Sequence, residues 1–294
     1  MCFRLRAKPQ PKGLNPELFV SNRVSTCDIV SANSTAWVRP KMDRKPIDAS
    51  KYDTDKAEHP HYLQAYEEYF RPLLDKDIRL LELGVYKGGS LFLWRDYFER
   101  GLIVGLDLQP IKLDDPSGRI RVYQGMQQDR DLLDRVAAET APQGFDVIID
   151  DCSHIGELTR ISFWHLFENH LKPGGLYVIE DWSTGYWDSF FDGIAFSYKP
   201  KLKFSPARFR IRSTFAHLQR SAPFLNRILR PVKRLSNRKQ FRSHDYGLVG
   251  FVKELVDECG MADISRPDRG TPPYRPSRFK EMKVVPGQVF IVKA

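Results

Sequence analysis

The sequence predicts an α/β fold built on a doubly wound, mostly parallel sheet, and three observations support this prediction. Short, wholly apolar segments recur through the middle of the chain. Segments whose apolar residues have helical spacing separate them, an alternation typical of βαβ units with helices on both faces of a parallel sheet. The last sixteen residues, FKEMKVVPGQVFIVKA, predict a C-terminal antiparallel hairpin that turns at Pro286 and Gly287.

The expected elements follow one another from about residue 60. A first amphipathic helix is expected over His61–Leu74, where leucine and aromatic residues recur at helical spacing. The strands expected in the parallel part are Arg79–Leu83, Leu102–Asp107, Ile120–Gln124, Phe145–Asp150 and Gly175–Glu180. The other expected helices are Gly89–Phe98, Arg130–Ala138, Leu158–His170 and Gly247–Asp257.

Length and composition exclude several classes of protein. A chain of 294 residues that is 41% hydrophobic and 12% aromatic is long enough for a sizeable core, and it is not wholly disordered. No apolar run approaches the ~18 residues of a membrane-spanning helix. The N-terminal residues lack the apolar stretch of a secretory signal. Four scattered cysteines without CxxC pairs argue against a zinc site or a disulfide framework and predict a reducing, cytoplasmic location.

The net charge of +9 is unevenly distributed along the chain. Residues 199–244 hold 14 lysines and arginines and no acidic residue, residues 1–50 carry +5, and the remainder carries −10. We therefore expect a poorly ordered tail over 1–50 and one acidic domain over 51–294 that a basic insertion at 199–244 interrupts. Translation that starts at Met42 instead of Met1 is a second hypothesis for the tail.

The basic insertion has several interpretations, which the sequence leaves open. Apolar residues at roughly helical spacing alternate with arginines and lysines, although Pro223 and Pro231 limit any helix to short pieces. Such a stretch suits an anionic membrane surface, which would place the protein peripherally on the inner face of the membrane. It also suits a polyanion, a partner protein or a solvated lid.

A glycine-rich turn follows the first expected strand, in the run LLELGVYKGGS. Its pattern differs from the dinucleotide fingerprint G-x-G-x-x-G, because Tyr86 holds the place of the glycine that makes room for a pyrophosphate. Asp107 lies 23 residues after Gly84, at the end of the next strand, where a carboxylate can bind both hydroxyls of a ribose. The pattern favours a nucleoside cofactor without a pyrophosphate over an ordinary strand-to-helix turn.

Acidic residues also end the fourth and fifth expected strands. Asp151 follows one strand, and Glu180 and Asp181 end the other, so all three are expected at the same edge of the sheet. Converging carboxylates repel one another unless a cation lies between them, and hard oxygen ligands suit Mg²⁺. His154 lies three residues beyond Asp151 and is a candidate general base. Asp150 is expected to pack under the site or to contact the cofactor.

These motifs resemble those of a known enzyme family. The glycine turn is similar to the first motif of class I S-adenosylmethionine-dependent methyltransferases, which have a Rossmann-like fold. The runs FDVIIDDCSH and LKPGGLYVIEDW resemble the Mg²⁺-dependent sugar O-methyltransferases of macrolide and related glycoside biosynthesis. This group includes mycinamicin and demethylmacrocin methyltransferases and cephalosporin hydroxylase-like relatives. The runs TDK at 54–56 and SHDYG at 243–247 also resemble it, so the similarity covers roughly 51–198 and 243–294.

The resemblance implies a Mg²⁺-assisted transfer of a methyl group to a hydroxyl of a sugar or glycoside, a glycolipid among the candidates. By the resemblance, Asp151, Glu180 and Asp181 would bind Mg²⁺, and His154 would be the general base. Residues of the glycine turn, of the second strand end and of the turn after the third strand would bind S-adenosylmethionine. They are Glu82, Gly84, Tyr86, Gly88, Ser90, Asp107, Gln128 and Asp129.

Two other functional classes remain as alternatives. The basic insertion motivates an RNA-modifying or RNA-binding protein, but the acidic edge of the sheet disfavours a phosphate backbone, which makes a nucleic-acid partner the weaker expectation. A non-catalytic interaction protein on a methyltransferase fold is disfavoured because the cofactor turn, the acids and the histidine occur together. The sequence leaves open which acceptor is used and whether the chain forms a homo-oligomer.

Overall fold

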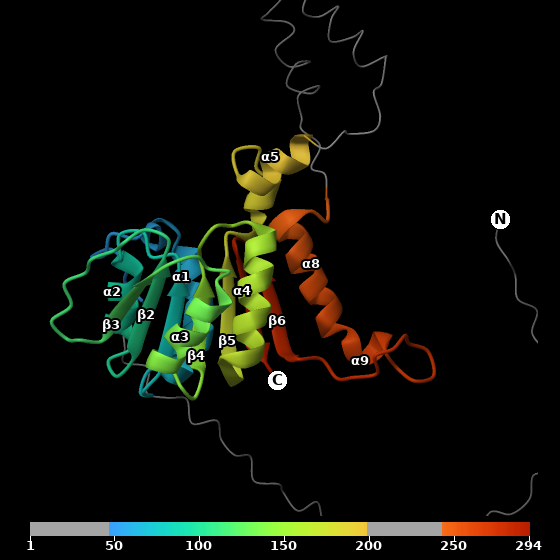
Figure 1. Cartoon of the computed structure of the whole chain (residues 1–294), viewed down its shortest axis with the longest axis horizontal. Helices are drawn as coiled ribbons and strands as arrows, with labels where there is room; N and C mark the ends of the chain where they lie inside the picture. Colours follow the sequence, from blue (N-terminus) through green and yellow to red (C-terminus); the bar gives the residue numbers. More distant parts are fainter. Residues whose placement is uncertain (1–46, 199–242) are drawn as a thin grey trace, which may run out of the picture. The chain divides into compact units, whose positions relative to one another are not determined.

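The computed structural model describes residues 47–198 and 243–294 (Figure 1). Most of the predicted tail, Met42 included, and most of the basic insertion lie outside the described residues, so the membrane and nucleic-acid interpretations of that insertion stay predictions. Every element described below belongs to one compact unit. Within the described ranges, no helix is both long and apolar enough to span a membrane.

A seven-stranded mixed sheet organises the described residues, with strand order β3-β2-β1-β4-β5-β7-β6. Strands β1 to β5 run parallel, and the C-terminal hairpin β6–β7 joins antiparallel to β5. This arrangement confirms the predicted fold class. The strands are β1 Arg79–Leu83, β2 Leu102–Asp107, β3 Ile120–Gln124, β4 Phe145–Asp150, β5 Leu171–Glu180, β6 Phe279–Val285 and β7 Gln288–Lys293.

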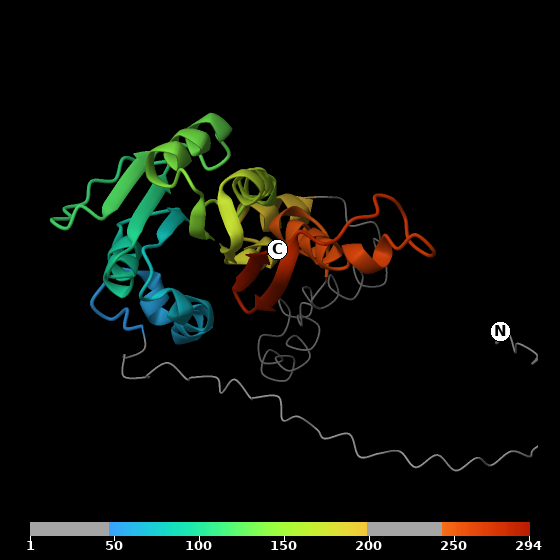
Figure 2. The ribbon, with the colours of Figure 1, turned by 90° about the horizontal axis from the view of Figure 1, so that it is seen from below.

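Helices cover both faces of this sheet (Figure 2). Helices α1 and α2 pack on one face, and α3, α4 and α8 pack on the other. The α-helices are α1 Pro60–Phe70, α2 Gly89–Tyr97, α3 Arg130–Thr140, α4 Gly156–Asn169, α5 Phe191–Tyr198, α8 Gly247–Cys259 and α9 Met261–Ile264. The 3-10 helices are η1 Asp55–Glu58, η2 Arg71–Leu73 and η3 Trp182–Tyr186.

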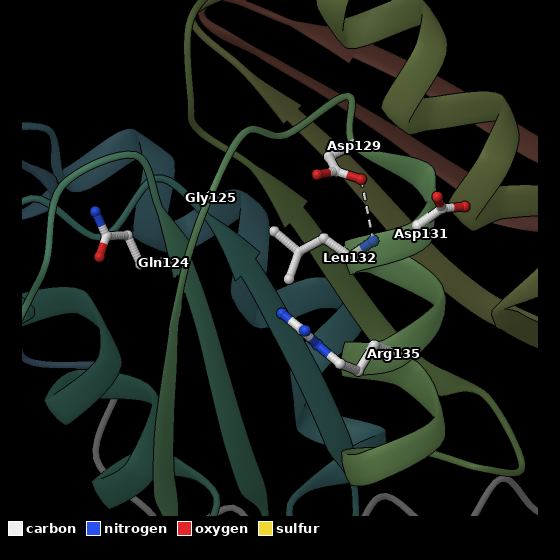
Figure 3. Close-up of a pocket in the computed structure, with 6 residues that line it drawn as sticks. All are labelled: Gln124, Gly125, Asp129, Asp131, Leu132 and Arg135. Carbon is white, nitrogen blue, oxygen red and sulfur yellow. Dashed lines mark hydrogen bonds between the residues drawn. The ribbon is translucent and has the colours of Figure 1, made fainter.

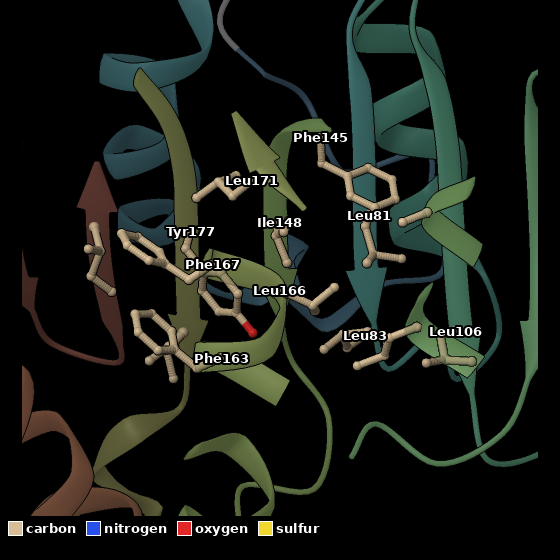
Figure 4. Packing of buried hydrophobic residues seen from close by; sticks show 14 of the residues in the cluster. Leu81, Leu83, Leu106, Phe145, Ile148, Phe163, Leu166, Phe167, Leu171 and Tyr177 are labelled. Carbon is tan, nitrogen blue, oxygen red and sulfur yellow. The ribbon is translucent and has the colours of Figure 1, made fainter. Parts of the chain in front are cut away.

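The central strands are buried on both faces, which explains why their sequences read as continuous apolar runs. On the α3, α4 and α8 face, Phe163 and Phe167 of α4 stack on each other, and Phe163 also packs edge-on against Tyr177 of β5 (Figure 4). Burial of one such side chain contributes roughly 2 kcal/mol. The sheet therefore forms a rigid support for the loops at its edges.

Two element boundaries differ from the sequence prediction by four residues, and the other predicted helix ends differ by at most two. Helix α1 ends at Phe70 and continues as η2, because Pro72 has no N–H with which to extend the α-helical bonding. Strand β5 begins at Leu171 instead of Gly175, since its pairing with β4 resumes after a register shift between Phe145 and Val147. The bounds of β1 to β4 agree with the prediction.

The carboxyl ends of β1 and β4 meet where the strand order reverses, which is the ligand-binding edge of an open α/β sheet. Gly84 lies there with φ of +90°, and a Cβ at this residue would lie 2.1 Å from the carbonyl oxygen of Asp151. The backbone N–H of Asp151 in turn donates to the carbonyl of Leu83 at 2.9 Å. The glycine thus lets the loop after β4 lie directly against the turn after β1.

A buried carboxylate joins three helices next to this edge. Asp192 on α5 accepts hydrogen bonds from the backbone N–H of Gly156, which begins α4, at 2.9 Å and of Leu248 in α8 at 2.7 Å. Both donors belong to helix N-termini, whose first N–H groups have no partner within their own helix. Asp192 therefore fixes where α4 starts, two residues after His154.

Replacement of Asp192 by Ala should lower the free energy of unfolding by about 3 kcal/mol, because two buried N–H groups lose their acceptor. Urea denaturation of the purified protein measures the change. The matched control is Asp131→Ala, which removes an exposed aspartate from the first turn of α3. Equal stabilities of the two variants would show that Asp192 does not hold the helix junction.

Candidate functional site

Three residues other than glycine have a positive φ in the described ranges, and all three lie at the carboxyl edge of the sheet. They are Tyr86 after β1, His154 after β4 and Asp181 after β5, each with φ of 52° or 53°. Residues with a side chain rarely adopt this conformation, and such strain concentrates at functional sites. Two of the three are the histidine and one of the acids that the sequence predicted for catalysis.

Asp151, His154 and Asp181 form a group with donor atoms within 4.8 Å of one another. Nε2 of His154 lies 4.0 Å from Oδ1 of Asp151. The other oxygen of Asp151, Oδ2, accepts a hydrogen bond from Lys56 at 2.7 Å. Oδ1 of Asp181 accepts one from the hydroxyl of Tyr62 at 2.6 Å. One oxygen of each aspartate is thus held by the protein, while the other has no donor bonded to it among the residues described.

Lys56 is the cation of this site, and the sequence had indicated it only through the family resemblance of the run TDK. Its side chain is 2% exposed, and its ammonium lies 2.7 Å from Asp151, 3.0 Å from Glu180 and 3.6 Å from Glu82. Burial lowers the pKa of Lys56, but the three carboxylates outweigh that effect and raise the pKa well above its ordinary value. Lys56 therefore stays charged and offsets part of the negative charge of the acids.

Glu180 has different surroundings from its neighbour Asp181. It is buried, and it accepts a hydrogen bond from the hydroxyl of Tyr66 on α1 in addition to its ion pair with Lys56. Burial raises the pKa of Glu180, and Lys56 opposes this shift. Glu180 is not a member of the group that Asp151, His154 and Asp181 form, although Lys56 bridges it to Asp151.

Glu82 is a buried carboxylate near the end of β1, with Lys56 3.6 Å from its Oε1. Ser90 and Trp94 are close enough to lower its pKa, but neither oxygen accepts a hydrogen bond of ordinary length from the described residues. Burial raises its pKa to about 7, against the attraction of Lys56. A buried acceptor without a partner is costly unless a ligand supplies a donor. Glu82 therefore fits the cofactor role that the family resemblance implies.

Asp107 ties the end of β2 to the glycine turn. Its Oδ2 accepts from the backbone N–H groups of Val85 at 2.8 Å and Tyr86 at 3.0 Å, and its Oδ1 accepts from Gln109 at 2.8 Å. A carboxylate has about four acceptor positions, so one remains for a ligand hydroxyl. The other predicted cofactor contacts in the glycine turn differ in exposure: Tyr86 is 75% exposed, whereas Gly88 and Ser90 are buried.

The turn after β3 contacts the loop that carries the site through hydrogen bonds of Gln127. Buried Gln127 donates to Ser162 at 3.3 Å and accepts from the backbone of Ser153 at 3.1 Å. Asp129 caps α3 through the N–H of Leu132, and both residues line an open cavity of about 310 Å³ together with Arg135 (Figure 3). None of the acids at the carboxyl ends of β4 and β5 lines this cavity. Gln128, which precedes Asp129, does not line the cavity, and its side-chain amide donates to the sulfur of Met126 at 3.4 Å.

Asp150 packs beneath the site, which is one of the two roles that the sequence predicted for it; the other was contact with the cofactor. It accepts hydrogen bonds from Ser162 and from the hydroxyl of Tyr177, both at 3.1 Å, and it is 2% exposed. Burial raises its pKa to about 6. Asp150 thus anchors the end of β4 and leaves the adjacent Asp151 to face the edge.

A second group of candidate metal ligands lies away from this edge. His165 and His170 both contact the same oxygen of Asp134, at 2.7 Å and 2.5 Å. Their partner, Asp134, is about half exposed. These contacts join α3 to the end of α4.

Comparisons with known proteins show which proteins the chain is similar to. No protein-family model matches the chain. It is 45% identical over 150 residues to mycinamicin VI 2''-O-methyltransferase of Micromonospora griseorubida, an alignment that covers 48% of this chain and 37% of that protein. It is 42% identical over 180 residues to demethylmacrocin O-methyltransferase of Streptomyces fradiae, which covers 58% of this chain and 43% of that protein.

A solved structure with a similar fold is that of the MycE methyltransferase from the mycinamycin biosynthetic pathway in complex with Mg and SAH. The match has a TM-score of 0.59 and 30% sequence identity, and it covers 85% of this chain and 54% of that chain. The resemblance to the macrolide sugar O-methyltransferases is confirmed. The chain spans about two fifths of the length of these curated relatives and about half of the solved structure.

Replacement of Lys56 by Met should lower the free energy of unfolding by about 4 kcal/mol, because three acids lose the cation that offsets their charge in a buried site. Chemical denaturation in metal-free buffer measures this effect. The control is Lys87→Met, which removes an exposed ammonium 3.0 Å from Asp53 and should leave the stability unchanged. Equal changes in the two variants would contradict a special role for Lys56.

Proposed function

We propose that this protein is an S-adenosylmethionine-dependent, Mg²⁺-assisted O-methyltransferase that acts on a hydroxyl of a sugar or glycoside. The observation that carries the proposal is the convergence of Asp151, His154 and Asp181 at the switch point of the sheet, beside the turn at Gly84. The similarity to O-methyltransferases of mycinamicin and demethylmacrocin biosynthesis, over part of their length, supports the same conclusion.

Asp151, Glu180 and Asp181 are the proposed ligands of Mg²⁺. The chemistry of this donor set fits the ion, because Mg²⁺ takes carboxylate oxygens and keeps several positions for water or substrate. Asp151 and Asp181 each have one oxygen to which no described donor is bonded. Glu180 lies behind them, and each of its oxygens keeps an acceptor position besides those used by Tyr66 and Lys56.

S-adenosylmethionine would lie along the carboxyl ends of β1 and β2. Asp107 is proposed to bind the ribose through its remaining acceptor position, and Glu82 to accept from a donor group of the cofactor. The turn from Gly84 to Ser90 would approach the cofactor, because its backbone crosses this edge of the sheet. Gln128 and Asp129 are assigned to the far end of the pocket, after β3, by the family resemblance.

The proposed reaction transfers one methyl group. Mg²⁺, when bound, would chelate neighbouring hydroxyls of the acceptor and lower the pKa of one of them. His154 accepts the proton of that hydroxyl as the acceptor oxygen forms a bond to the methyl carbon. The bond between that carbon and the sulfonium sulfur breaks, and its electron pair stays on sulfur. The strained backbone at His154 and Asp181 holds both side chains near the attacking oxygen.

Exposed apolar side chains around the site favour an acceptor whose sugar is attached to an apolar group. Large apolar side chains follow four of the parallel strands and are more than half exposed. Apolar side chains in the segments after the strands of an open sheet can contact an apolar part of a bound substrate. A macrolide-like glycoside or a glycolipid has this composition. These residues are Tyr86, Leu108, Met126, Trp187 and Phe191.

Replacement of His154 by Ala should reduce turnover by at least about 100-fold, because no other group at the site would accept the proton. Affinity for S-adenosylhomocysteine should stay within about twofold, since His154 is not assigned to the cofactor. Transfer of labelled methyl groups to a panel of glycosides, including mycinamicin VI and demethylmacrocin, measures turnover, and calorimetry measures affinity.

The control variant is His165→Ala, which alters a histidine on the adjacent helix α4 that pairs with Asp134. It should keep the wild-type rate. A wild-type rate in the His154 variant would refute the assignment of the base. Methyl transfer that is undiminished by a chelator would refute the metal-assisted reaction.

A further inference from the structure

The proposed metal site depends on donors from an element far away in sequence. Tyr62, on α1, lies 119 residues before Asp181, and its hydroxyl donates to Oδ1 of that aspartate at 2.6 Å. The tyrosine is buried, with 8% of its surface exposed. This contact leaves Oδ2 of Asp181 as the oxygen without a described donor, in the group with Asp151 and His154.

The tip of the C-terminal hairpin fixes the same aspartate from a second direction. The backbone N–H of Asp181 donates to the carbonyl of Gly287, in the turn between β6 and β7, at 2.6 Å. Gly287 has φ of +81°, and a Cβ at this position would lie 1.8 Å from the hydroxyl oxygen of Tyr62. A side chain at residue 287 would therefore displace Tyr62 from Asp181.

We propose that Tyr62 is a positioning residue for the metal, and that the hairpin tip at Gly287 holds it in place. Tyr62 binds one oxygen of Asp181, so that the other oxygen is directed toward the cation. Metal-binding carboxylates are commonly oriented by such a hydrogen bond, and its loss typically weakens metal binding by 10- to 100-fold. The inference rests on the proposed function, because it assumes that Asp181 binds the cation.

Helix α1 supplies a matched control. Tyr69 lies two turns after Tyr62, and its hydroxyl also donates to a carboxylate, Glu281, at 2.7 Å. Glu281 lies on β6, and neither residue of this pair belongs to the group of Asp151, His154 and Asp181. The glycine control is Gly118, which has φ of +64° and no atom within 4 Å of an added Cβ. Tyr69→Phe and Gly118→Ala therefore reproduce the chemical changes without the contact to Asp181.

The test is the affinity of the full chain for Mg²⁺, measured by calorimetry with S-adenosylhomocysteine present. Tyr62→Phe and Gly287→Ala should each raise the dissociation constant about 10- to 100-fold. Tyr69→Phe and Gly118→Ala should leave it within twofold of the wild-type value. Melting temperatures of all four variants separate folding effects from metal binding.

Two results would overturn the inference in distinguishable ways. Wild-type protein that binds no Mg²⁺ would refute the proposed function, and the role of Tyr62 with it. Wild-type protein that binds Mg²⁺, together with a folded Tyr62→Phe variant of equal affinity, would refute the positioning role alone. A lowered melting temperature with unchanged Mg²⁺ affinity counts as that second result, because it indicates a purely structural contact.

Discussion

The ion pairs of one buried ammonium determine how this site is built. Lys56 lies between Asp151, Glu180 and Glu82, which come from three adjacent strands of the sheet. Without a cation, three carboxylates this close in a buried site would repel one another and take up protons. Lys56 belongs to η1, so the same contact also fastens the segment before α1 to the carboxyl edge of the sheet. Lys56 thereby offsets the burial that raises the pKa of Glu82 and Glu180, next to a half-buried group that can bind a second cation.

The acids at this edge of the sheet differ in burial and in hydrogen-bond partners, and these differences separate their roles. Asp150 and Glu180 are buried, whereas Asp151 and Asp181 are half-buried and each keep one oxygen to which no described donor is bonded. Asp181 has a positive φ, and this change of backbone direction accompanies the different surroundings of the consecutive side chains of Glu180 and Asp181. Tyr62 of α1 and the backbone of the C-terminal hairpin contact Asp181, and Lys56 of η1 contacts Asp151. Elements from both ends of the described domain thus meet at one site.

Much of this could be predicted from the sequence because the relevant signals are local. The apolar runs of β1 to β4 gave their bounds, and the rule that ligands bind at carboxyl ends brought Asp151, His154 and Asp181 together. Lys56 has no such signal, since a single lysine in a polar run looks like any surface residue and its partners lie up to 124 residues away. The sequence treated Glu180 and Asp181 as a pair, but a one-dimensional pattern does not contain the contacts of Tyr66 and Tyr62 that separate their surroundings. Gly84 stays a predicted cofactor contact, and its missing Cβ also leaves room for the loop of Asp151, a contact that the sequence does not indicate.

The central claim is that a divalent cation binds between the outward oxygens of Asp151 and Asp181, with Lys56 on the opposite side of Asp151. Diffraction from crystals grown with Mn²⁺ and S-adenosylhomocysteine tests this claim directly, because Mn²⁺ accepts the same oxygen ligands and has an anomalous signal. We expect an anomalous peak within coordination distance of both aspartates, with the ammonium of Lys56 still bonded to Asp151. A peak only at Asp134, His165 and His170, or no peak at the edge of the sheet, would contradict it.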